Sequence, residues 1–218
     1  MIMVMIQRKT DTGQRLGGKS GRNKAEQRRE KKPPKPLNAE KMRDLALYYV
    51  GRFATTQSGL RTYLQRKVRE RGWADDDDTA IADTDAQIDA LIARLVDLHY
   101  IDDAAFASAK ADGLMRRGYG GRRVESMLYQ ARITEDDAAE ARDIAVQNRW
   151  SAAVRYAEKK RLGPFAQPDS SVKDRIKAAA AHQKALAAFL RAGHGFADAQ
   201  RLLAMKPGDP VDDAEGME

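Results

Sequence analysis

Residues 64–73 read LQRKVRERGW, and residues 124–133 read VESMLYQARI. The two stretches share one pattern, in which the marked residues are four, four and one positions apart: Leu64, Val68, Gly72 and Trp73 in the first, and Val124, Leu128, Arg132 and Ile133 in the second. A looser third copy consists of Leu186, Leu190, Gly193 and His194. Such repetition is typical of helical units that bury a face only against their neighbours.

Helical periodicity extends from these stretches over most of the chain. No proline occurs between Leu37 and Gly163, and apolar residues recur every three or four positions. No stretch alternates apolar and polar residues for long enough to seed a sheet. Nine helices are therefore predicted, beginning near Asn38, Ser58, Asp85, Asp102, Val124, Thr134, Trp150, Val172 and Phe196, with Gly163-Pro164 ending the seventh.

The expected fold is all-α, an elongated array of three tandem three-helix repeats with a disordered basic N-terminal tail. After Trp73 the next apolar stripe starts later than in the other copies, which implies an acidic insertion of about ten residues. The predicted division is a disordered basic tail (1–36), repeat 1 with the acidic insertion near 74–84 (37–101), repeat 2 (102–148), repeat 3 (149–205) and a disordered acidic C-terminal tail (206–218).

Charge is distributed unevenly along the chain. Residues 1–36 contain 11 Lys and Arg against three acids, whereas the other 182 residues contain 28 bases and 29 acids. The tail also holds three of the seven prolines and few large apolar residues, so it cannot bury enough surface to offset its ordering entropy. No apolar run is long enough for a signal-peptide core or a membrane span, so we expect a cytoplasmic protein. We also expect a monomer.

The composition argues against an active centre. There are no cysteines, and the three histidines show no metal-ligand spacing, so we expect neither a metal nor a catalytic residue. Residues 13–20 (GQRLGGKS) match the P-loop pattern, but the strand and the apolar helix that a nucleotide site needs are lacking around them. Residues 75–78 are four aspartates and read as a solvated loop rather than a calcium loop. No cofactor is predicted.

Basic residues inside the helical body are the candidate contact residues. They cluster at corresponding places in successive repeats, and a single such residue is most simply explained as part of a solvated face. Aligned clusters, in contrast, form a surface for phosphates or for acidic groups of a protein. The candidates are Arg61, Arg66, Lys67, Arg116, Arg117, Arg122, Arg123, Lys159, Lys160 and Arg161.

Over residues 40–205 the sequence resembles the RecX family, bacterial regulators of the RecA recombinase. The resemblance is carried by Ala46-Leu47, Leu60-Arg61, Leu91, Leu95, Tyr100-Ile101-Asp102-Asp103, Phe106-Ala107, Arg117-Gly118, Val124, Leu128 and the run from Phe189 to Gly193. Arg132 stands where the family usually has glycine, at a helix end that favours positive φ, so we expect that turn to be strained or differently shaped.

The resemblance implies a non-enzymatic protein that lies in the groove of a RecA filament on single-stranded DNA. There it would inhibit ATP hydrolysis and strand exchange in recombination and DNA repair, with possible direct DNA contact. The alternative is a helical-repeat protein that acts on nucleic acid directly, because three-helix units are also the material of helix-turn-helix modules. A third hypothesis, an enzyme that uses residues 13–20, requires a nucleotide site in the tail.

Overall fold

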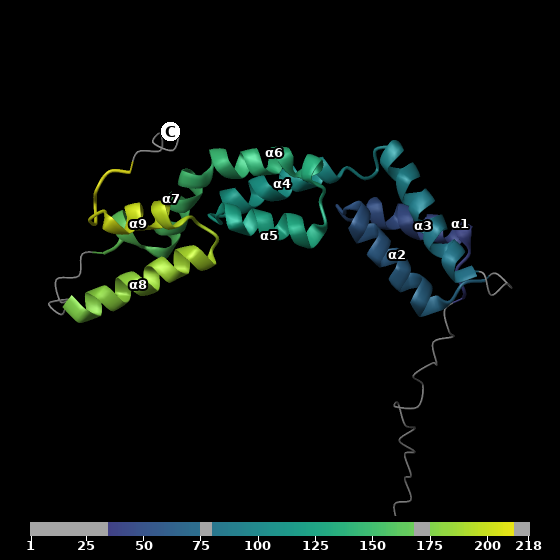
Figure 1. The fold of residues 1–218 in the computed structure, drawn as a ribbon, viewed down its shortest axis with the longest axis horizontal. Coiled ribbons are helices and arrows are strands. Elements are labelled where there is room, and N and C mark those ends of the chain that lie inside the picture. The colour runs from purple at the N-terminus through teal and green to yellow at the C-terminus, as the bar shows by residue number, and fades with distance from the viewer. Residues whose placement is uncertain (1–34, 75–79, 168–174, 212–218) are drawn as a thin grey trace, which may run out of the picture. The chain divides into compact units, whose positions relative to one another are not determined.

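The computed structural model describes residues 35–74, 80–167 and 175–211 (Figure 1). Within these ranges the chain forms nine α-helices, one short 3-10 helix and no strand; one isolated parallel bridge joins Leu37 and Trp73. The all-α prediction is confirmed. The predictions for the tail up to residue 34, the P-loop-like residues 13–20, the aspartates 75–78 and residues 212–218 lie outside the described residues.

Helices α1 (Ala39–Val50), α2 (Gln57–Arg71) and α3 (Ala80–Asp97) enclose the first apolar core. Leu60 and Leu64 of α2 are fully buried there, and Ile88 of α3 packs against them. Leu37 precedes α1 and exchanges backbone hydrogen bonds with the end of α2: its amide donates to the Gly72 carbonyl at 2.9 Å, and its carbonyl accepts from the Ala74 amide at 2.8 Å.

A second core lies among α4 (Asp103–Arg116), α5 (Gly121–Ala131) and α6 (Glu135–Gln147), which run side by side in Figure 1. Many of its buried side chains are small, so the helix backbones approach closely: the alanines at 107, 111, 138 and 141 are all buried. Val124 and Leu128 of α5, two marked residues of the repeated pattern, fill the remaining space.

A third core joins α7 (Arg149–Lys160), the short η1 (Gly163–Phe165), α8 (Arg175–Arg191) and α9 (Phe196–Ala204). Phe189 and Leu202 are fully buried in it, and Trp150 at the start of α7 is 4% exposed. The described helices therefore surround three separate apolar cores, as tandem three-helix units require.

Helix starts follow the predicted caps at three places. Asn38 Oδ1 accepts from the Lys41 amide, and Asp102 Oδ1 accepts from the Ala105 amide at 2.7 Å. Thr134 Oγ1 accepts from the Asp137 amide and donates to the Asp137 carboxylate at 2.7 Å. The predicted starts of α1, α4 and α6 are confirmed.

Three predicted helix starts are wrong. Helix α5 begins at Gly121, three residues before the predicted Val124. Helix α2 begins at Gln57, because Thr56 rather than Ser58 caps it by accepting from the Gly59 amide at 3.0 Å. Helix α3 begins at Ala80, upstream of Asp85, whose carboxylate accepts from Gln65 on α2 at 2.9 Å. A side chain that joins two helices was mistaken for a cap.

The ends of two helices refine the prediction. Helix α7 stops at Lys160, before Gly163-Pro164, because Arg161 adopts a left-handed conformation with φ of 53°. The three corresponding positions of the repeated pattern also have positive φ: 75° at Gly72, 54° at Arg132 and 94° at Gly193. Arg132 shares the positive φ of the glycines, which strains a residue with a Cβ atom, but with ψ of 42° against 168° at Gly72 its turn is also shaped differently from that one.

Two glycine turns meet where the second and third cores adjoin. The Gly120 amide donates to the Ala192 carbonyl at 3.0 Å, and the Arg122 amide donates to the Gly193 carbonyl at 3.1 Å. A Cβ atom at Gly120 would overlap backbone atoms of Gly193 and His194, so only glycine permits this approach.

Replacing Arg132 by glycine should raise the free energy of unfolding by about 1 kcal/mol, because glycine adopts the left-handed conformation without the steric cost of a Cβ atom. The Arg132 side chain is exposed, so little contact is lost. The matched control Gln130→Gly, inside α5, should lower the free energy of unfolding by about 1 kcal/mol. Urea unfolding measures both; an Arg132→Gly protein as unstable as the control contradicts the argument.

Gly120→Ala should lower the free energy of unfolding by about 2 kcal/mol, because the added methyl group forces two backbone turns apart. The control is Gly113→Ala in α4, where a Cβ meets nothing within 4 Å. That substitution should instead stabilise the protein by about 0.8 kcal/mol through helix propensity. Equal thermal midpoints for the two variants would show that the turns do not depend on this contact.

Candidate functional site

The ten cations predicted as contact residues fall into two groups. Four of them have carboxylate partners within the described residues. Arg61 pairs with Asp89 of α3, and Arg116 pairs with Asp112 at 2.8 Å. Both Arg66 and Lys67 reach Glu70, at 3.7 and 2.6 Å, and these two contacts lower the pKa of Glu70, with the Lys67 hydrogen bond as the largest cause. The positive charge of these four is largely balanced inside the molecule.

The other six form no ion pair with any described residue, and all are exposed: Arg117, Arg122, Arg123, Lys159, Lys160 and Arg161. Their charge is available to a ligand. Three of them, Arg117 from the end of α4 with Lys159 and Lys160 from the end of α7, line one groove.

This basic groove has a volume of about 600 Å³ and lies against α8. Two further cations line it, Lys184 and Arg191 of α8, and no carboxylate does. Its floor consists of Leu162, the side chains of Tyr119 and Tyr156, and small residues of α8. A concave surface with a single sign of charge concentrates the electrostatic potential and attracts anionic ligands.

Local structure explains why these side chains meet. Gly118, with φ of 80°, ends the segment after α4, and a Cβ there would lie 3.1 Å from the Tyr156 amide nitrogen, so glycine allows the close approach to α7. The Tyr156 hydroxyl donates to the Ala188 carbonyl at 3.1 Å and so joins α7 to α8. Burial raises the pKa of Tyr156, which keeps this donor protonated.

The remaining predicted cations lie elsewhere. Arg61, Arg66 and Lys67 are on α2 and do not line the groove. Arg123 lies over the Tyr119 ring at 6.0 Å. Arg122 lines a separate hollow of about 410 Å³ that also contains Glu125 and Asp198. Arg161 is exposed at the end of α7 and lies outside both hollows.

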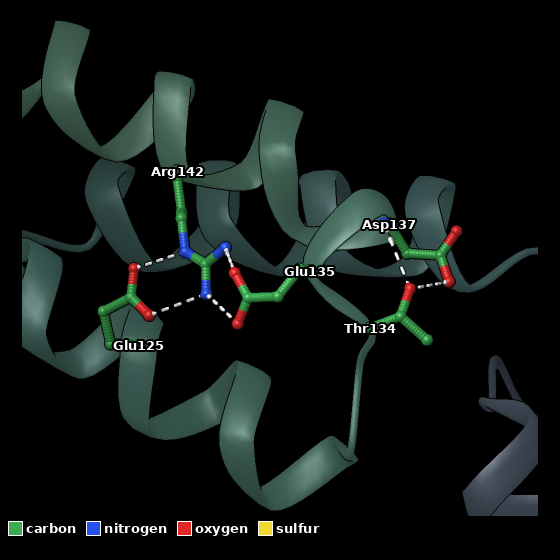
Figure 2. Close-up of polar contacts among 5 residues, drawn as sticks. All are labelled: Glu125, Thr134, Glu135, Asp137 and Arg142. Carbon is green, nitrogen blue, oxygen red and sulfur yellow. Dashed lines mark hydrogen bonds and ion pairs between the residues drawn. The ribbon is translucent and has the colours of Figure 1, made fainter.

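Arg142 in the separate hollow is already neutralised (Figure 2). Its guanidinium lies between Glu125 of α5, at 3.0 Å, and Glu135 of α6, at 2.5 Å. These contacts raise the pKa of Arg142, with the Glu135 hydrogen bond as the largest cause, and lower the pKa of Glu135. The arrangement fastens α5 to α6 and leaves the basic groove as the better anion site.

Lys184 and Arg191 were missed because sequence reasoning looked for adjacent basic residues, and these two are isolated in an alanine-rich helix. The sequence nevertheless contains a signal that distinguishes the groove cations from the paired ones. None of the five groove cations has an acid three or four positions away along the chain, the spacing at which helical side chains pair. Arg66, Lys67 and Arg116 each have one.

Comparisons with known proteins agree with this architecture. A family model described as RecX, second three-helix domain, matches residues 102–141, which contain α4, α5 and the first part of α6. The Regulatory protein RecX of Myxococcus xanthus (strain DK1622) is 30% identical over 202 residues, which cover 87% of this chain and 97% of that protein. The chain belongs to the RecX family.

The RecX-family assignment confirms the resemblance and the tandem three-helix organisation. Members of this family are regulatory proteins by name, which agrees with a site built for binding. No helix of the described ranges is sufficiently long and apolar to span a bilayer.

Beneath the groove of this RecX-family chain lies a buried histidine. His194 is 2% exposed, and its ring contacts those of Tyr156 and Phe189, with centroids 5.2 and 5.5 Å away. Its Nε2 lies 3.1 Å from the Gly118 carbonyl oxygen, which only accepts, so Nε2 carries a proton. Burial lowers the pKa of His194, and the neutral ring supports the segment that presents Tyr119 to the groove.

Stability should fall as the pH drops from 7.5 to 5. An unfolded histidine takes up a proton near pH 6.5, whereas the buried ring resists protonation to lower pH, so the contribution of His194 is complete above pH 6.5 and is lost below it. Thermal unfolding of His194→Gln should show a lower midpoint at pH 7.5 and a weaker pH dependence. The control His182→Gln, at an exposed position of α8, should keep the original dependence; identical profiles for the two variants contradict this assignment.

Proposed function

We propose that this chain regulates the RecA recombinase by binding its filament on single-stranded DNA, and that binding suppresses ATP hydrolysis and strand exchange. Membership of a family of regulatory proteins supports a regulatory role. The observation that carries the proposal is the basic groove, which is lined by five cations that form no ion pair with a described residue.

The groove favours binding over chemistry. Its polar groups are ammonium, guanidinium and phenol groups, with no carboxylate or imidazole in the lining to act as a general base. A RecA–DNA filament offers repeated phosphates and carboxylates to such a surface. We therefore propose a regulator that acts by binding, without a catalytic residue, metal or cofactor, and we further propose that it is a cytoplasmic monomer.

The three cores also suggest how a small protein engages a large polymer. We propose that they correspond to three repeats, 37–101, 102–148 and 149–205, each contributing its own surface to the filament. Arg117 from the second repeat and Lys159 and Lys160 from the third then form one contact region, and Arg122, Arg123 and Arg161 lie on neighbouring surfaces.

A second candidate function is direct action on nucleic acid. The same groove cations support it, because DNA phosphates also attract basic groups. Binding to naked duplex DNA with sequence preference, and without recombinase, favours this candidate. Salt dependence does not separate the two functions, since both rely on basic groups.

The double substitution Lys159→Glu and Lys160→Glu should raise the protein concentration needed for half-inhibition of the DNA-dependent ATPase of RecA by at least about tenfold. The reason is that two of the five groove cations then repel the partner. Circular dichroism should remain unchanged, since both side chains are exposed at a helix end.

The matched control is Arg43→Glu with Arg94→Glu, which changes the net charge equally at exposed positions of α1 and α3 outside the groove. The control should inhibit RecA as the original protein does. An ATPase rate that stays constant at saturating original protein refutes the proposed function. Equal inhibition by the groove variant and the original protein refutes the groove as the contact.

A further inference from the structure

The floor of the basic groove is lined by small apolar residues of a single helix face. Ala181, Ala185, Ala188 and Ala192 of α8 and its end all line it, at spacings of four, three and four. Residues at this spacing form one continuous stripe along a helix. The stripe extends over about 16 Å, or three helical turns, and Leu162 of the α7–η1 segment extends the apolar surface.

Cations flank this stripe. Lys184 and Arg191 lie seven residues apart on α8, and Lys159 and Lys160 come from α7 on the other wall. The groove therefore combines an apolar floor with basic edges. Methyl side chains on the floor allow the backbone of a partner to come close, as small residues do wherever helices pack tightly.

The floor is poorly suited to nucleic acid bases. Single strands are held by aromatic platforms that leave a ring face open for stacking. Here the Tyr156 ring packs against Phe189 and His194, and its hydroxyl is bonded to the Ala188 carbonyl. The guanidinium of Arg123 lies over the ring of Tyr119. The remaining floor is aliphatic and offers no side-chain hydrogen-bonding group to a base edge.

We infer that the basic groove is a docking site for an acidic amphipathic helix of a protein partner. The apolar stripe of that helix lies on the alanines of α8, and its glutamates and aspartates pair with the five cations of the edges, a mode in which a helix is held by anchors at i, i+3, i+4 and i+7. The inference rests on the proposed function only in assigning this groove to partner binding.

The test uses the full chain and a fluorescein-labelled 16-residue peptide in which leucines at i, i+3, i+4 and i+7 form one stripe and the other positions are mostly glutamate. Fluorescence anisotropy should show binding at least about tenfold tighter than that of a scrambled peptide with the same composition. A peptide with lysine in place of glutamate should not bind. Equal binding of the scrambled peptide shows attraction by charge alone and overturns the inference.

Two variants locate the peptide. Ala185→Trp fills the groove without changing charge and should abolish binding, whereas Ala179→Trp, at an exposed position of α8 outside the lining, should not. Lys184→Glu with Arg191→Glu should weaken binding at least about tenfold. This pair keeps the test valid if the tryptophan disturbs folding. The control of equal charge, Arg43→Glu with Arg155→Glu, should bind normally; loss of affinity in that control, or normal binding by the groove variants, overturns the inference.

A labelled oligothymidylate of 20 nucleotides is the competing probe. Tight binding of this probe that Ala185→Trp abolishes, with no binding of the acidic peptide, makes the groove a single-strand site and overturns the inference. The RecA ATPase is measured with the same proteins. Peptide binding without RecA inhibition supports the groove as a helix-docking site and refutes the proposed function. RecA inhibition without peptide binding supports the proposed function and overturns the inference about the groove.

Discussion

The close contact of two glycine turns is the constraint on which the basic groove depends. The amides of Gly120 and Arg122 donate to the carbonyls of Ala192 and Gly193, and glycine is required for the backbones to come so near. Arg117 and Arg191 lie a few residues before these two turns. Backbone hydrogen bonds therefore fix the segments that carry them, and neither arginine forms an ion pair with a residue that the structure describes.

The same use of helix ends recurs along the chain. The last carbonyls of a helix lack partners within it and must be satisfied by other groups. The Gly72 carbonyl, after α2, accepts from the Leu37 amide, and the Ala131 carbonyl, at the end of α5, accepts from the Thr56 hydroxyl at 3.4 Å. Residues with positive φ at Gly72, Arg132 and Gly193 turn the chain at these ends. Each copy of the sequence pattern thus ends in a turn whose carbonyl groups accept hydrogen bonds from a neighbouring segment.

The sequence predicted the fold well where the signal is local. Periodicity and caps gave the helical class, three of the helix starts and the correspondence among Gly72, Arg132 and Gly193. It failed at Asp85, whose side chain accepts from Gln65 on a neighbouring helix, because a tertiary contact leaves no mark within a short window. For example, Asp103 is 7% exposed and accepts from the Gln57 amide 46 positions away, and burial raises its pKa.

The basic groove was predictable from the sequence only in part. Which cations share it depends on how α4, α7 and α8 meet, and the sequence analysis predicted only Arg117, Lys159 and Lys160 of the five. Which cations stay available is, in contrast, largely a local property. An ion pair at i, i+4 contributes only about 0.2–0.5 kcal/mol to a helix, but it places an acid of the same chain beside the basic side chain.

Along α2 and α4 acids stand at the pairing distance and balance Arg66, Lys67 and Arg116. At the groove positions no acid occupies those places; around Lys184 and Arg191 they hold alanine, histidine and glycine. Beyond residue 36 the chain has nearly equal numbers of acids and bases, so the groove does not arise from an excess of positive charge. It arises because no acid stands three or four positions from any of the five cations, and the fold then brings these cations to one surface.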